Sequence, residues 1–104
     1  MEVVLSKKEE FDSYKNKGRV VIDFNAKWCG PCRMLSPVLE ELAEEDEDLL
    51  VLKVDTDEFP ELAYQFNVSS IPALFYVLDG QVVGSSLGYM PKDKIKKIIH
   101  EKLG

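Results

Sequence analysis

The chain alternates short apolar runs of strand length with segments whose apolar residues recur at helical spacing, and this alternation restricts the fold most. Val20–Phe24 and Leu49–Val54 are rich in β-branched and aliphatic residues, which suit buried strands. Between them, apolar residues recur every three or four positions and predict one apolar helix face: Leu35, Val38, Leu39 and Leu42. Strands that alternate with helices pair in parallel, so the pattern predicts an α/β fold.

Further signals precede this central unit. Val3–Leu5 is a short strand candidate. Ser6–Glu9 has the sequence of a capping box, in which the serine hydroxyl would accept from an amide three residues on and the glutamate would reach back. It predicts a helix that runs to about Asn16 and is ended by Gly18.

The second half of the chain predicts one more helix, a hairpin and a last helix. Asp57 is expected to cap a helix over Glu58–Phe66. Ala73–Leu78 and Gln81–Leu87 flank Asp79–Gly80, a strong hairpin signal because both turn positions need positive φ. A final apolar stripe predicts a helix that opens at Pro91 and carries Ile95, Ile98, Ile99 and Leu103. The order is βαβαβαββα, which predicts a mixed five-stranded sheet flanked by four helices.

The length of 104 residues is that of one compact domain, and no repeat or low-complexity linker interrupts it. We therefore expect residues 1–104 to form a single domain. Hydrophobic residues make up 45% of the chain and charged residues 31%, a balance that argues against a disordered protein.

Charge and apolar patterns disfavour two kinds of partner. The net charge of −6 repels phosphate backbones, so we expect no nucleic-acid partner. No segment approaches the roughly 18–20 apolar residues of a membrane span, so we expect no membrane partner. Met1–Ser6 has no basic region and no long apolar stretch, which argues against a signal peptide. We expect a cytoplasmic protein that is a monomer.

Cys29 and Cys32 are the only cysteines, and they lie between a predicted strand and a predicted helix. A structural disulfide explains them weakly, because so short a loop removes only about 2 kcal/mol of chain entropy. A zinc site needs four ligands and only His100 remains, so we expect no metal. Covalent haem attachment requires a histidine directly after the second cysteine, where this chain has Arg33.

The position of the pair favours redox chemistry. Cys29 lies where unpaired amide groups and the positive end of a helix dipole favour a thiolate, the reactive form of cysteine. Cys32, one turn inside the helix, is expected to be more buried but within reach of the first sulfur. Two idle thiols remain the alternative.

Asp23 and Lys53 each place a charge inside an apolar strand. By strand alternation, Asp23 shares a face with Val21, and Lys53 shares a face with Val51. If the two strands are adjacent, the two charges approach each other. A buried carboxylate without a partner has a raised pKa, which suits a proton acceptor near neutral pH. Taken alone, each residue is more often an ordinary half-exposed strand residue.

The motif Trp28–Cys32, which reads Trp-Cys-Gly-Pro-Cys, resembles the active-site motif of the thioredoxin family. Other segments that resemble this family follow at similar spacing and extend the likeness over essentially the whole chain: Val21–Phe24, Lys53–Asp55, Ile71–Ala73, Asp79–Gly80 and Leu87–Gly88. Gly30 and Pro31 complete the motif, and Pro31 resembles the reducing members, since isomerases usually carry histidine there. The resemblance implies the thioredoxin fold.

The resemblance also implies a protein-disulfide reductase that works by dithiol–disulfide exchange. Cys29 would attack a disulfide of a client protein, and Cys32 would then resolve the mixed disulfide. A flavin-containing thioredoxin reductase would regenerate the dithiol with NADPH. Flavin and NADPH belong to that partner, so we expect no cofactor bound to this chain. In the family, the residue matching Asp23 assists deprotonation of the second cysteine, with Lys53 in support.

The family further implies a substrate groove opposite the cysteines. It places a cis proline at the position of Pro72, and Ile71 would offer its backbone to an extended substrate. Gly88 would leave room on the same surface. Trp28 is an aromatic residue of the kind usually found in a core, but beside a reactive cysteine it can line the substrate surface. Tyr89 would add apolar contact area at the rim.

Asn25 departs from the family pattern, because many thioredoxins carry a large aromatic residue four positions before the first cysteine. A smaller, polar residue there would loosen the packing behind the motif or open the surface around it. Two other functions compete with the reductase. One is a thiol oxidase or isomerase, which Pro31 argues against. The other is a binding subunit that uses the fold and its apolar groove to hold a partner.

Overall fold

The computed structural model describes residues 1–104 and contains five strands and four α-helices. The strands are β1 (Glu2–Val4), β2 (Arg19–Asn25), β3 (Leu49–Asp55), β4 (Ala73–Leu78) and β5 (Gln81–Leu87). The helices are α1 (Phe11–Lys15), α2 (Gly30–Glu45), α3 (Pro60–Gln65) and α4 (Lys92–Leu103), and a 3-10 turn over Lys8–Glu10 precedes α1. This order confirms the predicted βαβαβαββα sequence of elements.

One mixed sheet holds all five strands in the order β1-β3-β2-β4-β5. The strands β1, β3 and β2 run parallel, β4 runs antiparallel to β2, and β5 runs antiparallel to β4. The last two strands form the predicted hairpin, in which Asp79 has φ +50° and Gly80 has φ +86°. Both turn residues therefore adopt the left-handed conformation that a tight hairpin requires.

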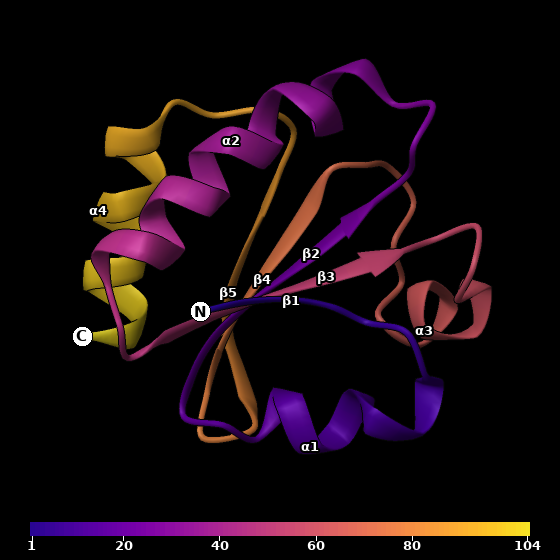
Figure 1. Ribbon diagram of the computed structural model, residues 1–104, viewed down its shortest axis with the longest axis horizontal. Helices are drawn as coiled ribbons and strands as arrows, with labels where there is room; N and C mark the ends of the chain where they lie inside the picture. The colour runs from indigo at the N-terminus through magenta and orange to yellow at the C-terminus, as the bar shows by residue number, and fades with distance from the viewer.

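Helices cover both faces of the sheet, with α1 and α3 on one face and α2 and α4 on the other (Figure 1). Each face is one apolar cluster. Val20, Ile22 and Phe24 of β2 point toward α1 and α3, whereas Val21 points toward α2 and α4. Asp23 is the next residue on the α2 side, so strand alternation places a carboxyl group beneath that helix.

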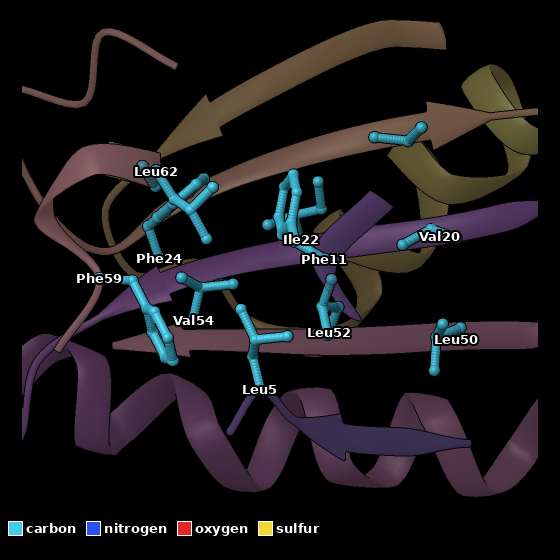
Figure 2. Packing of buried hydrophobic residues seen from close by; sticks show 12 residues of the cluster. Leu5, Phe11, Val20, Ile22, Phe24, Leu50, Leu52, Val54, Phe59 and Leu62 are labelled. Atoms are coloured by element: carbon cyan, nitrogen blue, oxygen red, sulfur yellow. The ribbon is translucent and has the colours of Figure 1, made fainter. Parts of the chain in front are cut away.

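Aromatic packing fixes one end of the cluster under α1 and α3. The ring of Phe24 lies 5.4 Å from that of Phe66 and 5.7 Å from that of Phe75. Figure 2 shows Phe24, Val54, Phe59 and Leu62 gathered at this end. Because burial of one such side chain contributes about 1.5–3 kcal/mol, this end anchors β2 immediately before the cysteine loop.

The predicted capping box at Ser6 is wrong. The amide of Leu5 donates to the carbonyl oxygen of Lys53 at 2.9 Å, so the chain continues in extended form beyond β1. Lys7 is also extended and opens the 3-10 turn without any side-chain cap. The helical segment therefore begins later than Ser6, because pairing with the sheet takes priority over a local cap.

The predicted cap at Asp57 is also wrong. The amides of Asp57 and Glu58 both donate to Oδ1 of Asp55, which forms a local turn. The helix α3 then begins at Pro60, after Phe59. In contrast, α2 begins at Gly30, directly after Cys29, so Cys32 lies in its first turn.

No helix in the structure combines the length and the apolar character needed to cross a membrane.

Candidate active site

The two cysteines lie at the N-terminus of α2 and are joined as a disulfide with a Cα–Cα separation of 5.2 Å. Cys29 is the N-cap residue of this helix, and its Sγ accepts from the amide of Cys32 at 3.2 Å. The expectation that Cys32 is the more buried residue is wrong, because each cysteine is 5% exposed. Their surroundings distinguish them: the sulfur of Cys29 accepts from a helix amide, whereas Cys32 lines a pocket with Asp23.

The loop before β4 lies against the disulfide. The Ile71–Pro72 peptide bond is cis, as expected from the family resemblance. Sγ of Cys29 lies 3.9 Å from the carbonyl oxygen of Ile71. The backbone of this loop therefore approaches the reactive sulfur directly.

Gly88 ties the end of β5 to the same loop, since its amide donates to the carbonyl oxygen of Pro72 at 2.8 Å. Its φ of +81° is strained for a residue with a side chain. Apart from Gly88 and its two chain neighbours, no residue has an atom within 4 Å of where a Cβ would stand. In the free protein, position 88 therefore favours glycine because of its backbone conformation, and not because a side chain would clash with a neighbouring residue.

Trp28 is not a core residue, because it is 69% exposed. Its Nε1 donates to Oδ2 of Asp57 at 2.8 Å, which holds the indole across the surface beside Cys29. A hollow of about 200 Å³ lies between Trp28 and Ile71. Tyr89 is 42% exposed and also presents an aromatic side chain to the surface. Sequence reasoning missed the role of Asp57, since a residue read as a helix cap carries no sign of a partner 29 positions away.

Asp23 is 3% exposed and lies opposite Lys53, because β2 and β3 are adjacent and these residues are in register. The predicted proximity is therefore confirmed, but the two side chains form no ion pair. The ammonium group of Lys53 instead donates to Oγ of Ser36 on α2. Oδ1 of Asp23 has no hydrogen-bond partner in the chain. Ser36 was not found from the sequence, because nothing in the helical pattern marks it.

Burial raises the pKa of Asp23 to about 6, while the positive charge of Lys53 and a hydrogen bond from Asn25 act to lower it. This outcome agrees with the raised pKa predicted for a buried carboxyl group. Near neutral pH the carboxyl group is thus able to gain and lose a proton, as a proton acceptor requires.

A pocket of about 300 Å³ opens behind the disulfide and reaches Asp23 and Cys32. Its remaining lining residues are Asn25, Ala26, Lys27, Arg33, Ser36 and Lys53. A buried disulfide, helix amides on one side and a titratable carboxyl group on the other suit thiol–disulfide exchange. The chain has no group of three or more His, Cys, Asp or Glu side chains that could hold a metal ion.

The sequence matches the model of the thioredoxin family over residues 2–101. The chain belongs to the thioredoxin family. It is 41% identical over 104 residues to the thioredoxin of Bacillus subtilis strain 168, covering 99% of this chain and 100% of that protein. It is 50% identical over 91 residues to the thioredoxin of Chlamydia trachomatis serovar D, covering 88% and 89% of the two chains.

Solved structures agree with this assignment. A mutant thioredoxin from Halobacterium salinarum NRC-1 superposes with a TM-score of 0.91 at 36% identity, covering 99% of this chain and 91% of that one. The thioredoxin fold predicted from the sequence is therefore confirmed. As a member of this family with a bonded Cys29–Cys32 pair, the protein is a protein-disulfide oxidoreductase that acts by dithiol–disulfide exchange.

Proposed function

We propose that this protein is a general protein-disulfide reductase, with Cys29 as the attacking thiolate and Cys32 as the resolving thiol. The observation that carries the proposal is the Cys29–Cys32 disulfide at the N-terminus of α2, with the carbonyl oxygen of Ile71 beside Sγ of Cys29. The helix amides and dipole stabilise negative charge on Cys29 after reduction. The amide of Cys32 donates to Sγ of Cys29, whereas no hydrogen bond reaches Sγ of Cys32.

The reaction transfers two electrons from the dithiol to the client. The Cys29 thiolate attacks one sulfur of the client disulfide, forms a mixed disulfide and expels the other client sulfur as a thiolate. Cys32 then loses its proton and attacks Sγ of Cys29, which expels the second client thiolate. The products are a reduced client and the Cys29–Cys32 disulfide that the structure contains.

Asp23 is the proposed acceptor of the Cys32 proton. Both residues line the pocket behind the disulfide, and the pKa of Asp23 near 6 allows the carboxylate to take up a proton and release it again near neutral pH. Lys53 supports this role, because its charge lies in register with Asp23 and favours the ionised carboxylate.

The client backbone is proposed to lie along the surface between the cis-proline loop and Trp28. Ile71 offers backbone groups beside the reactive sulfur, in the manner of strand addition. Pro72 and Gly88, joined by a backbone hydrogen bond, shape the opposite wall of this surface. Exposed Trp28 and Tyr89 supply apolar contact area, and Gly30 and Pro31 form the first turn of α2 between the cysteines.

We propose that a flavin-containing thioredoxin reductase returns the disulfide to the dithiol with electrons from NADPH. Both groups stay on that partner, so the electron carriers of this chain are its two sulfurs. We also propose a cytoplasmic location and a monomeric, single-domain protein. The reducing compartment follows from the chemistry, because a dithiol donor has to be kept reduced between turnovers.

A redox titration of the Cys29–Cys32 pair in defined dithiol/disulfide buffers, followed by fluorescence, tests the proposal. Trp28 is the only tryptophan and adjoins Cys29, so its emission reports the bond. A reductase requires a potential at or below that of the glutathione pool, roughly −220 to −260 mV by extraction. A potential well above that range would instead identify an oxidase or isomerase.

Two variants separate the roles of the cysteines. Cys29→Ser is expected to abolish reduction of the insulin disulfides, whereas Cys32→Ser is expected to trap a mixed disulfide on Cys29. Reduction of insulin by the Cys29→Ser protein would contradict the mechanism. Full biological activity of the double serine variant would show that the protein acts as a binding subunit instead.

A further inference from the structure

Asn25 occupies the end of β2, at the position where its family often has a large aromatic residue. Its carbonyl oxygen accepts from the amide of Thr56 at 2.8 Å, so its backbone is held by the loop that follows β3. Because side chains alternate along a strand, Asn25 projects to the same face as Asp23. Both residues line the pocket behind the disulfide.

The amide group of Asn25 contacts Asp23 twice. Nδ2 lies 3.1 Å from the backbone oxygen of Asp23 and 3.4 Å from its Oδ2. No other hydrogen bond reaches the Asp23 carboxyl group, since its Oδ1 has no partner and Lys53 donates to Ser36. Asn25 is therefore the single donor in this chain that meets the buried carboxyl group.

We propose that Asn25 is a positioning residue for the exchange reaction: its side-chain amide donates to Asp23 and favours the ionised form of the proton acceptor beside Cys32. A hydrogen bond to a carboxylate stabilises the charged form relative to the neutral acid. The bond at 3.4 Å is long, so its effect is smaller than that of an ideal charge-assisted bond. This inference rests on the role proposed above for Asp23.

Other charges around Asp23 act alongside Asn25. Lys53 on β3 lowers the pKa of Asp23, and Glu2 on β1 raises it. The neighbour on β4 is Leu74, which carries no charge. The further ionisable groups that line the pocket are Lys27 before α2 and both Cys32 and Arg33 within α2. Asn25 differs from all of these because it acts through a hydrogen bond and carries no charge of its own.

Asn25→Leu removes the donor and keeps a branched side chain of similar size. We expect the Asp23 carboxyl group, followed by carbon NMR in the oxidised protein, to titrate about half a unit higher, which changes the ratio of ionised to protonated acid about threefold. The pH midpoint of single-turnover insulin reduction should shift upward by the same amount. A merely structural role for Asn25 would leave both midpoints in place.

The control is the same substitution in an Asp23→Asn background, where we expect it to leave the pH profile unchanged. Unfolding in urea checks that each variant is folded. An unmoved Asp23 titration in Asn25→Leu would overturn the inference about Asn25 and leave the role of Asp23 intact. If Asp23→Asn alone keeps the wild-type pH profile, the role of Asp23 fails, and the effect of Asn25 on the reaction fails with it.

Discussion

Trp28 and Asp57 are joined by a hydrogen bond of 2.8 Å from Nε1 to Oδ2, although the two residues lie 29 positions apart. The bond ties the loop before α2 to the loop after β3. It holds an indole ring that is 69% exposed in one position next to the reactive disulfide. The aromatic side chain is thus presented to clients in a restrained orientation, which lowers the entropy cost of binding them.

Asp57→Ala should therefore impair client binding more than stability. The bond is exposed, so we expect the free energy of unfolding to fall by less than about 1 kcal/mol. KM for a protein disulfide should rise about threefold with little change in kcat, which corresponds to the loss of a binding interaction. Asp57→Asn retains an oxygen acceptor and serves as the control. An unchanged KM in Asp57→Ala would contradict this role.

Asp23 makes stability depend on pH in a direction opposite to most carboxylates. The pKa of Asp23 is about 6 in the folded protein, against the ordinary value of 3.8 that applies to the unfolded chain. Between pH 3.8 and pH 6 the folded protein therefore binds more protons than the unfolded chain does. Stability contributed by the neutral acid is therefore present below pH 4 and is lost as the pH rises through 6. The two-unit difference corresponds to roughly 3 kcal/mol at pH 8.

Asp23→Asn is expected to recover most of this free energy above pH 7 and almost none of it at pH 4. Urea unfolding of both proteins across this range measures the difference, in which the effects of all other carboxyl groups cancel. A constant difference between pH 4 and pH 8 would show that Asp23 is not titrating with a raised pKa.

Gly88→Ala should lower both stability and client affinity. Its φ of +81° costs an alanine about 1 kcal/mol, and the strain falls on the residue whose amide donates to Pro72. Gly18→Ala is a matched control, because Gly18 has φ +89° and likewise no neighbour within 4 Å of a Cβ. We expect equal stability losses in denaturation and a raised KM only for Gly88→Ala. Equal KM values for the two variants would remove Gly88 from the substrate surface.

Leu39 and Met34 test the core on the face that carries α2. Leu39 is fully buried and Met34 is 61% exposed on the same helix. Leu39→Ala should cost about 2–5 kcal/mol of unfolding free energy, because it removes apolar contacts and leaves a cavity. Met34→Ala should change it by no more than about 0.5 kcal/mol. Similar losses in the two variants, measured by urea denaturation, would contradict this packing.

The elements were predictable because their signals are local. The apolar run Val20–Phe24, interrupted only by Asp23, marks a strand that is buried on both faces, and the apolar stripe from Leu35 to Leu42 marks one helix face. Asp79–Gly80 predicts a turn without reference to distant partners, because these two residue types tolerate the positive φ that the turn requires. The spacing of Cys29 and Cys32 likewise determines that the two sulfurs can meet.

The two wrong predictions, the helix caps at Ser6 and Asp57, concern side chains whose hydrogen-bond partners depend on the tertiary fold. Ser6 begins a sequence typical of a helix cap, but the hydrogen bond from the amide of Leu5 to the carbonyl oxygen of Lys53 keeps the chain extended there. Asp57 is a residue type that commonly caps helices, but the carboxylate of Asp55 already accepts the nearby amides. The carboxylate of Asp57 instead accepts a hydrogen bond from Nε1 of Trp28. A polar group forms whichever hydrogen bond the surrounding geometry favours, and sequence distance does not enter into that choice.

Local signals in the sequence were enough to predict the order of strands and helices, the position of the cysteine pair at a helix start and the presence of one carboxyl group within an apolar strand. The surroundings of that carboxyl group depend on the packed fold, which places Lys53 in register, directs its ammonium group toward Ser36 and leaves Asn25 as the donor. The periodic spacing of apolar residues is a property of nearby positions in the sequence and is visible without the fold. The electrostatics of Asp23 depends on burial and on charges from other elements, which exist only once β2, β3 and α2 have packed together.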